Sequence, residues 1–180
     1  MELINAIESR RSIRKYLDKM VEKELILDII SAGHLAPSAK NRQPWYFIVV
    51  STDIKNKIAD MMIKHAEAHP NEEKLSTVIP TATFMKEGNT LILILKSIDN
   101  DYLVNDTLSI GACIENMCLR ATDLGLGALW IRDIIHVEKD VLELINHHEL
   151  ELSSALLLGY PNQSPKPRPR KDVDTIIEWY

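Results

Sequence analysis

Two groups of cationic side chains stand near opposite ends of the 180-residue sequence and could bind an anion. In order, they are Arg10, Arg11, Arg14, Lys166, Arg168 and Arg170. A guanidinium group matches phosphate oxygens in two-pronged geometry, and the hydroxyl of Ser12 would add a further donor. Both groups together would suit one phosphate monoester. The alternative is that each is an ordinary stretch of solvated surface charge.

A polar loop in the first quarter of the chain could bind a planar heterocycle. It runs from Ala36 to Pro44 and carries Ser38, Asn41 and Gln43, whose donors and acceptors would suit the edge of such a ring. Loops rich in proline and short polar side chains often carry binding sites. An ordinary polar surface loop is the alternative.

Two closely spaced glycines, Gly125 and Gly127, follow the most apolar helical pattern of the sequence. They would let the chain turn tightly, so that backbone amides near Ile131–Asp133 could approach a ligand. A helix C-cap explains these glycines equally well.

Familiar catalytic signatures are missing. The sequence has no phosphate loop G-x-x-x-x-G-K-[ST], no G-x-G-x-x-G after a strand, no H-E-x-x-H and no G-x-S-x-G. Cys113 and Cys118 lie five positions apart in a helical pattern, which favours two core residues over a redox or zinc pair. The adjacent His147 and His148 lack metal-binding spacing. We therefore expect no metal.

The elements that must position these residues follow from the periodicity of apolar side chains. Helical spacing predicts helices over Glu2–Ser9, Val21–Leu35, Ile54–His65, Asp106–Leu124 and Val137–Asn146. Aromatic and β-branched runs predict strands over Trp45–Ser51, Thr90–Lys96, Ala128–Arg132 and Ser153–Tyr160. Prolines at positions 70 and 80 indicate that His69–Glu87 is irregular.

Composition limits the class of protein. With 46% hydrophobic and 26% charged residues, the chain falls in the range of one globular domain, here 1–180. A net charge of −5 argues against a nucleic-acid partner. No apolar run approaches the roughly 20 residues that span a membrane, and the N-terminus lacks the order of a secretory signal. We therefore expect a cytoplasmic protein.

The order and spacing of four motifs resemble those of the nitroreductase family of FMN-dependent oxidoreductases. The motifs are Arg10-Arg-Ser-x-Arg14, Ala36-Pro-Ser-Ala-x-Asn-x-Gln-Pro-Trp45, Leu124-Gly-Leu-Gly-Ala-Leu-Trp-Ile131, and Leu158-Gly-Tyr-Pro followed by Pro165-Lys-Pro-Arg168. The resemblance extends through nearly the whole chain and is weakest over residues 63–89.

The resemblance implies an α+β sandwich, in which a mostly antiparallel sheet is flanked by helices, built as an intertwined homodimer with FMN at the subunit interface. It also gives a destination to Val173–Tyr180, whose aromatic residues have no local core of their own. Trp179 and Tyr180 would dock on the partner subunit.

The resemblance also assigns residues to the FMN site. Those on the phosphate and ribityl side are Arg10, Arg11, Ser12, Arg14, Lys166 and Arg168. Those that line the flavin from the partner subunit are Pro37, Ser38 and Ala39, with Asn41 reaching toward its polar atoms. The backbone near Arg132 and Asp133 would face flavin N5. Many relatives have Glu-Gly or a single small residue there, so this pair departs from the family pattern.

The implied reaction passes electrons from NADH or NADPH through flavin N5 to a nitroaromatic, quinone or similar small acceptor in a ping-pong cycle. Because the flavin carries the redox chemistry, no side chain needs to act as a nucleophile, base or metal ligand. Two alternatives stay open. One is a specialised relative that performs dehalogenation, flavin fragmentation or dehydrogenation of a small substrate, and the other is a flavin-binding module without turnover.

Overall fold

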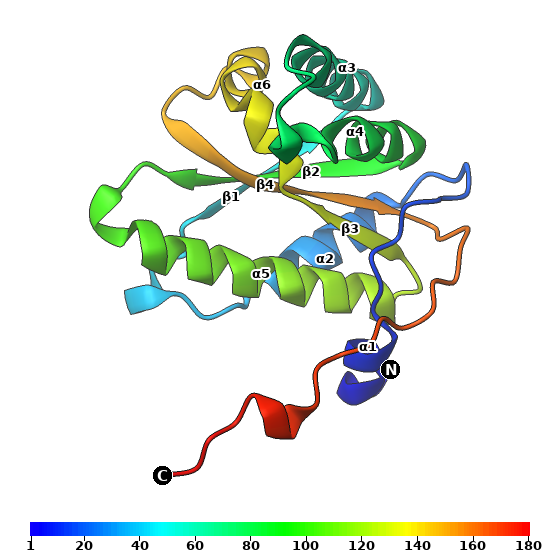
Figure 1. The fold of residues 1–180 in the computed structure, drawn as a ribbon, viewed down its shortest axis with the longest axis vertical. Coiled ribbons are helices and arrows are strands. Elements are labelled where there is room, and N and C mark those ends of the chain that lie inside the picture. The colour runs from blue at the N-terminus through cyan, green and yellow to red at the C-terminus, as the bar shows by residue number, and fades with distance from the viewer.

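A four-stranded antiparallel sheet forms the middle layer of the structure, a computed structural model that describes residues 1–180 (Figure 1). Its strands are β1 (Trp45–Val50), β2 (Thr90–Ser97), β3 (Gly127–Ile131) and β4 (Leu150–Gly159). They lie in the order β1-β2-β4-β3, and every neighbouring pair is antiparallel. The two longest strands therefore occupy the centre of the sheet.

Helices cover both faces of this sheet. They are α1 (Leu3–Ser9), α2 (Lys23–His34), α3 (Thr52–Ala68), α4 (Val78–Glu87), α5 (Leu103–Asp123) and α6 (Glu138–Ile145). In Figure 1, α3, α4 and α6 lie on one face, and α2 and α5 lie on the other. The predicted α+β sandwich is confirmed.

Strand β2 shows why each face of the sheet has its own core. Successive side chains of a strand point to opposite faces. Leu91, Leu93 and Leu95 therefore pack in a cluster with α3 and α4, whereas Ile92 and Ile94 pack in a second cluster with α2 and α5. Because β2 is buried on both faces, its sequence is an unbroken apolar run rather than an alternation.

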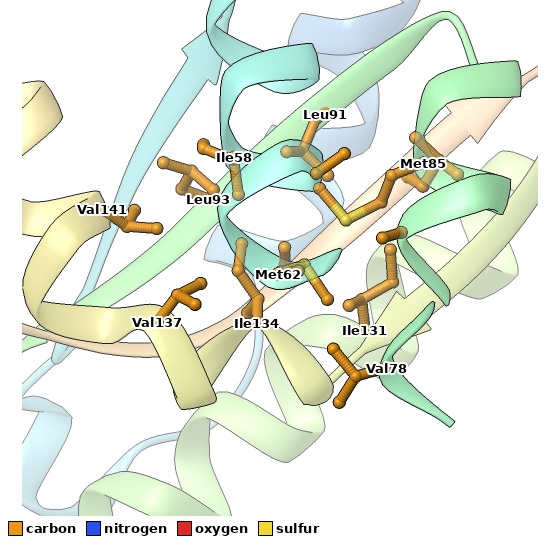
Figure 2. Packing of buried hydrophobic residues seen from close by; sticks show 14 of the residues in the cluster. Ile58, Met62, Val78, Met85, Leu91, Leu93, Ile131, Ile134, Val137 and Val141 are labelled. Atoms are coloured by element: carbon orange, nitrogen blue, oxygen red, sulfur yellow. The ribbon is translucent and has the colours of Figure 1, made fainter. Parts of the chain in front are cut away.

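Figure 2 shows the first cluster from close by. Ile58 and Met62 of α3 and Met85 of α4 lie against Leu91 and Leu93 of β2, and all five side chains are fully buried. This packing fixes α4 against the sheet.

Helix α5 is the core helix of the other face, as its apolar pattern predicts. Its Cys113 and Cys118 are unpaired and buried. Burial raises the pKa of each thiol to about 12, so neither is poised for redox chemistry. Beyond the end of α5, Gly125 has φ +75°, the left-handed conformation that favours glycine after a helix.

The segment His69–Glu87 is not irregular as predicted, because it contains α4. Pro80 is the third residue of this helix, and in the first turn a missing backbone N–H costs no helical hydrogen bond. Val78, Ala82 and Met85 form the buried face at helical spacing. The apolar spacing was therefore a better guide than the proline.

Strand β4 begins at Leu150, three residues before the predicted start. Its first residues pair with the end of β2 beyond a bulge near Ile94 and Leu95. Lys96 and Glu151 form an ion pair across this part of the sheet. Such a charged pair interrupts the apolar pattern, which explains why the sequence does not reveal the first residues of β4.

The last twenty residues, 161–180, leave the sheet and extend past α1 to the C-terminus (Figure 1). Trp179 is 91% exposed and Tyr180 is fully exposed. The docking of these aromatics on a partner subunit stays a prediction. None of the helices combines the length and the apolar character that crossing a bilayer requires.

Candidate functional site

The two ends of the chain lie side by side along the β3 edge of the sheet. After α1, Ile13 donates its backbone N–H to the carbonyl oxygen of Ala128 in β3, at 3.0 Å. Leu17 then donates to the carbonyl oxygen of Tyr160 at 2.9 Å, and Asn162 donates to that of Lys15 at 2.9 Å. These backbone bonds bring the first basic group next to the segment that carries the second.

Two glycines let the N-terminal segment approach the sheet. Gly127 and Gly159 face each other across β3 and β4. A Cβ at Gly127 would lie 2.8 Å from side-chain atoms of Ile13, and one at Gly159 would lie 2.7 Å from the ring of Tyr16. Real Cβ atoms do not approach so closely, so both positions need glycine for the segment to pack where it does. Gly127 therefore serves this close approach, and Gly125 serves the helix end.

The residues of both basic groups surround one hollow of about 510 Å³, which we name the basic hollow. Its polar lining residues are Glu8, Arg10, Arg11, Ser12, Arg14, Lys166, Arg168 and Arg170. Six of these side chains are cationic and one is acidic, so the hollow carries a strong positive charge. The predicted convergence of segments more than 150 positions apart is what the structure shows.

Two arginines of the basic hollow, Arg11 and Arg14, have no carboxylate partner in the chain. Arg11 donates through Nη1 to the backbone oxygens of Glu8 and Arg10, both at 2.7 Å, while its buried Nε has no partner. Arg14 makes a single long bond of 3.3 Å to the backbone oxygen of Ser12. Arg10 is paired with Glu115 at 3.2 Å. Because buried polar groups are normally satisfied, the unpartnered Nε of Arg11 and the weakly bonded Arg14 beside it fit an anion such as a phosphate.

A second hollow of about 370 Å³, which we name the α4 pocket, adjoins the basic hollow and shares Arg14 with it. Its lining residues are Arg14, Thr77, Pro80, Thr81, Phe84, Leu129, Trp130, Ile131, Arg132 and Asp133. The Arg14 guanidinium lies 5.9 Å from the centre of the Phe84 ring. The α4 pocket thus extends the charged hollow with a partly apolar space at the end of β3.

The predicted pair Arg132 and Asp133 lies in the α4 pocket. The Asp133 carboxylate accepts a hydrogen bond of 2.7 Å from the hydroxyl of Thr81, whereas Arg132 is exposed. Asp133 is therefore tied to α4. Sequence reasoning missed Thr77, Pro80, Thr81 and Phe84, because it treated α4 as irregular.

The predicted loop residues lie elsewhere. Pro37, Ser38, Ala39 and Asn41 line neither hollow. Their loop is fastened to the first turn of α5 through Arg42, whereas the basic hollow lies toward the other end of α5, where Met1 pairs with Asp123. A helix of 21 residues is about 31 Å long. One chain therefore does not bring all the predicted site residues together.

Arg42 is the centre of an ion-pair network at the loop. Its guanidinium donates to both carboxylate oxygens of Asp106, at 3.2 and 3.3 Å, and to Asp99 at 2.7 Å. It also lies 3.9 Å from the ring centre of Tyr102. The hydrogen bonds to Asp106 and then Asp99 raise the pKa of Arg42 above its ordinary value, so the side chain stays charged.

Three of the six histidines, His65, His69 and His136, lie close together. The ring of His65 lies 4.6 Å from that of His69 and 6.2 Å from that of His136, measured between centres. No group of three or more histidine, cysteine or acidic side chains is arranged to hold a metal ion.

Comparisons with known proteins agree on one family. The family model described as "Nitroreductase family" matches residues 7–160. A relative in Methanothermobacter thermautotrophicus, provisionally named NADH dehydrogenase/NAD(P)H nitroreductase, is 31% identical over 186 residues. That match covers 98% of this chain and 86% of the relative.

Two solved structures show the same fold over their full length. A protein from Desulfovibrio desulfuricans, provisionally described as a nitroreductase and solved in complex with FMN, superposes with a TM-score of 0.82 at 26% identity. The match covers 100% of this chain and 97% of that one. A BluB-like flavoprotein from Clostridium difficile 630 superposes with a TM-score of 0.86 at 27% identity, covering 100% and 99% of the two chains.

Proposed function

The chain belongs to the nitroreductase family, and from that premise we propose that it is an FMN-dependent oxidoreductase. It passes electrons from NADH or NADPH to a nitroaromatic, quinone or similar small acceptor in a ping-pong cycle. The observation that carries this proposal is the basic hollow, where six cationic side chains from both ends of the chain converge and the buried Nε of Arg11 has no hydrogen-bond partner. The FMN complex of the Desulfovibrio desulfuricans protein, which has the same fold, supports FMN as the anion.

The basic hollow would hold the phosphate of FMN. A phosphate monoester carries about two negative charges and three acceptor oxygens, which suits several convergent guanidinium groups. The residues proposed for this task are Arg10, Arg11, Ser12, Arg14, Lys166 and Arg168. Arg14 differs from the others because it lines both the basic hollow and the α4 pocket. It would therefore lie between the phosphate and the ring of the cofactor.

The α4 pocket would hold the flavin ring and the reacting molecules. Bound FMN would supply the redox chemistry that the side chains of this protein lack. Arg132 and Asp133 would present backbone near N5, and the hydrogen bond from Thr81 to Asp133 would hold that segment in place. Phe84 and Trp130 would give the pocket its apolar walls and limit the access of water.

We further propose that the working unit is a homodimer. The loop carrying Pro37, Ser38, Ala39 and Asn41 lies away from both hollows, so it would complete the FMN site of a second copy. The exposed apolar side chains of α5, Leu103, Val104 and Leu108, support such an interface. Trp179 and Tyr180 would dock on the partner, as the sequence predicts.

The remaining parts of the proposal concern the whole chain. Residues 1–180 would form one FMN-binding domain, because both ends of the chain build the same hollow. The location would be cytoplasmic, which is consistent with two cysteines that are buried and unpaired.

Steady-state turnover tests the proposed reaction. Purified protein with added FMN is mixed with NADH or NADPH and a nitroaromatic or a quinone, and nicotinamide absorbance is followed. We expect oxidation that depends on both FMN and the acceptor, and parallel lines in a double-reciprocal plot because the two substrates react in turn. A protein that binds FMN but shows no acceptor-dependent oxidation with either donor would be a flavin-binding module instead.

A further inference from the structure

The loop at residues 38–43 has an unusual backbone. Lys40, Asn41 and Gln43 have φ values of 51°, 54° and 50°. This left-handed region is disfavoured for residues with a Cβ, and three such residues within four positions are uncommon. Backbone of this kind persists only where the surroundings enforce it, and it is frequent at binding sites.

Arg42 supplies the enforcement, because it lies between these strained residues and bonds to Asp99 and Asp106 outside the loop. Its two bonds to Asp106 reach a carboxylate that is only 1% exposed, so the loop is anchored in the body of the protein. The bond to Asp99 and the contact with the Tyr102 ring fix the guanidinium from the other sides. Lys40 adds a bond of 2.7 Å to the Tyr102 hydroxyl.

The consequence of this anchoring is the display of Asn41. Gln43 donates its backbone N–H to the Ser38 hydroxyl oxygen at 2.9 Å, which closes the loop on itself. Asn41 is exposed, and its side-chain amide has no hydrogen-bond partner in the chain. The loop therefore presents a free amide on a backbone that is already shaped before any ligand arrives.

We propose that Arg42 is a positioning residue for FMN: through Asp106 it holds the 38–43 loop in the strained shape that contacts the flavin in the partner's site. Arg42 itself touches no cofactor. This inference rests on the proposed function, because it takes FMN to be the ligand of the loop. It adds to that function a residue that does not contact the ligand. Arg42 is the unspecified position x in the motif Asn-x-Gln, between Asn41 and Gln43.

Arg42→Met and Arg120→Met form a matched pair of variants for the test. Like Arg42, Arg120 makes a two-pronged bond to an aspartate, here Asp28. It lies on α5 itself, near the end away from the loop. Both variants are titrated with FMN by the quenching of flavin fluorescence, and their folding is followed by circular dichroism. We expect Arg42→Met to weaken FMN binding at least tenfold and Arg120→Met to change it less than twofold.

Two further measurements separate positioning from general stability. Arg42→Lys keeps the positive charge but loses the two-pronged geometry of the guanidinium. Compared with Arg42→Met, it should therefore restore part of the affinity for FMN and most of the visible spectrum of the bound flavin. Asp106→Asn should weaken binding as Arg42→Met does, and the double variant should be no weaker than either single one, because both act through one contact.

The outcomes decide cleanly. Wild-type affinity in folded Arg42→Met, or additive losses in the double variant, would overturn the positioning role while leaving the FMN site intact. If Arg42→Met does not fold, Arg42→Lys decides, and equal affinity and spectrum to wild type would refute the proposal. A wild-type chain that binds no FMN would overturn both this inference and the proposed function.

Discussion

Arg14 is the residue that joins the basic hollow to the α4 pocket. It lines both, it makes only a long bond to backbone, and its guanidinium lies near the Phe84 ring. Its charge is therefore available to a ligand that extends from one hollow into the other. Arg168, from the far end of the chain, lies across the basic hollow and is exposed.

We expect Arg14→Ala and Arg168→Ala to weaken FMN binding strongly while changing the free energy of unfolding little. A hydrogen bond to a charged group contributes about 1.5 to 3 kcal/mol, so each substitution should raise the Kd for FMN by roughly 10- to 150-fold. The free energy of unfolding of the FMN-free protein should change by no more than about 0.5 kcal/mol, as for most surface positions. Fluorescence titration and urea unfolding give the two quantities.

Lys15→Ala is the matched control for this prediction. Lys15 follows Arg14 directly and is exposed, but it lines neither hollow. Its removal should leave FMN binding unchanged. Equal losses in Lys15→Ala and Arg14→Ala would show that only overall charge matters, and the basic hollow would not be the phosphate site.

At the residue scale, the sequence reveals charges better than it reveals contacts. The two basic groups can be recognised because clustered cationic residues stand out in a chain whose net charge is −5. The structure brings them together. Thr81 and Phe84 could not be recognised, since a hydroxyl and a ring on a surface helix look like many others. The φ values of Lys40 and Asn41 are equally hidden, because the residue types do not demand them.

At the scale of elements, the approach of the N-terminal segment to β3 depends on Gly127. An alanine there would place its Cβ 2.8 Å from Ile13, so the segment must move or the strand must bend. Overpacking of this kind costs about 1–3 kcal/mol. We expect Gly127→Ala to lower the free energy of unfolding by that amount and also to weaken FMN binding, because Ile13 stands between Ser12 and Arg14.

Gly111→Ala provides the comparison. Gly111 lies in α5, and a Cβ there would meet Trp130 at an ordinary 3.9 Å. Alanine in a helix is favoured over glycine by roughly 0.5–1 kcal/mol, so this variant should be at least as stable as wild type. Urea unfolding of both variants tests the pair, and a Gly127→Ala protein as stable as Gly111→Ala would contradict the tight packing.

The contact between α2 and α5 predicts a pH dependence. Hydrogen bonds from Arg120 lower the pKa of Asp28, and the N-terminal amine together with Arg120 lowers the pKa of Asp123. A carboxyl whose pKa is lower in the folded state stabilises the fold above its ordinary value of 3.8. That contribution is lost as the pH falls through the lowered folded pKa.

We therefore expect Arg120→Met to lose less stability than wild type between pH 7 and pH 3. Chemical unfolding at the two pH values measures the difference, and Asp28→Asn should behave in the same way because it removes the other half of the pair. A pH dependence identical to that of wild type in both variants would mean that the ion pair does not link α2 to α5 in solution.

Elements were predicted where periodicity and length agreed. The long apolar pattern of α5 predicts a helix and the short apolar run of β2 predicts a strand, and the structure contains both elements. The sequence does not reveal α4, because Pro80 suggests a break although the first turn of a helix tolerates proline. The early start of β4 was hidden by its charged cross-strand pair.

At the scale of the whole molecule, the residues of the proposed FMN site lie in two separate regions of one chain. The basic hollow and the α4 pocket lie beside β3, and the 38–43 loop is anchored at the opposite end of α5. The strand order and the path of the chain ends cannot be derived from local periodicity, since they depend on which strands pair. The family resemblance supplied that information, and it also supplied the expectation of a second chain.

Mixed dimers test the composite FMN site most directly. Arg14→Ala damages the hollow, and the double variant Ser38→Ala/Asn41→Ala damages the loop. The two chains carry different affinity tags, so that dimers with one chain of each kind can be isolated. If each site combines the hollow of one chain with the loop of the other, one site of the mixed dimer has both defects and the other has none.

We expect the mixed dimer to bind one FMN with wild-type affinity, although neither variant does so alone, and we expect the wild-type dimer to bind two. Equilibrium titration with FMN, read by the visible absorbance of the bound flavin, gives both the affinity and the number of sites. A mixed dimer with two weakened sites and no wild-type site would contradict the composite FMN site, because each chain would then build its FMN site from its own residues.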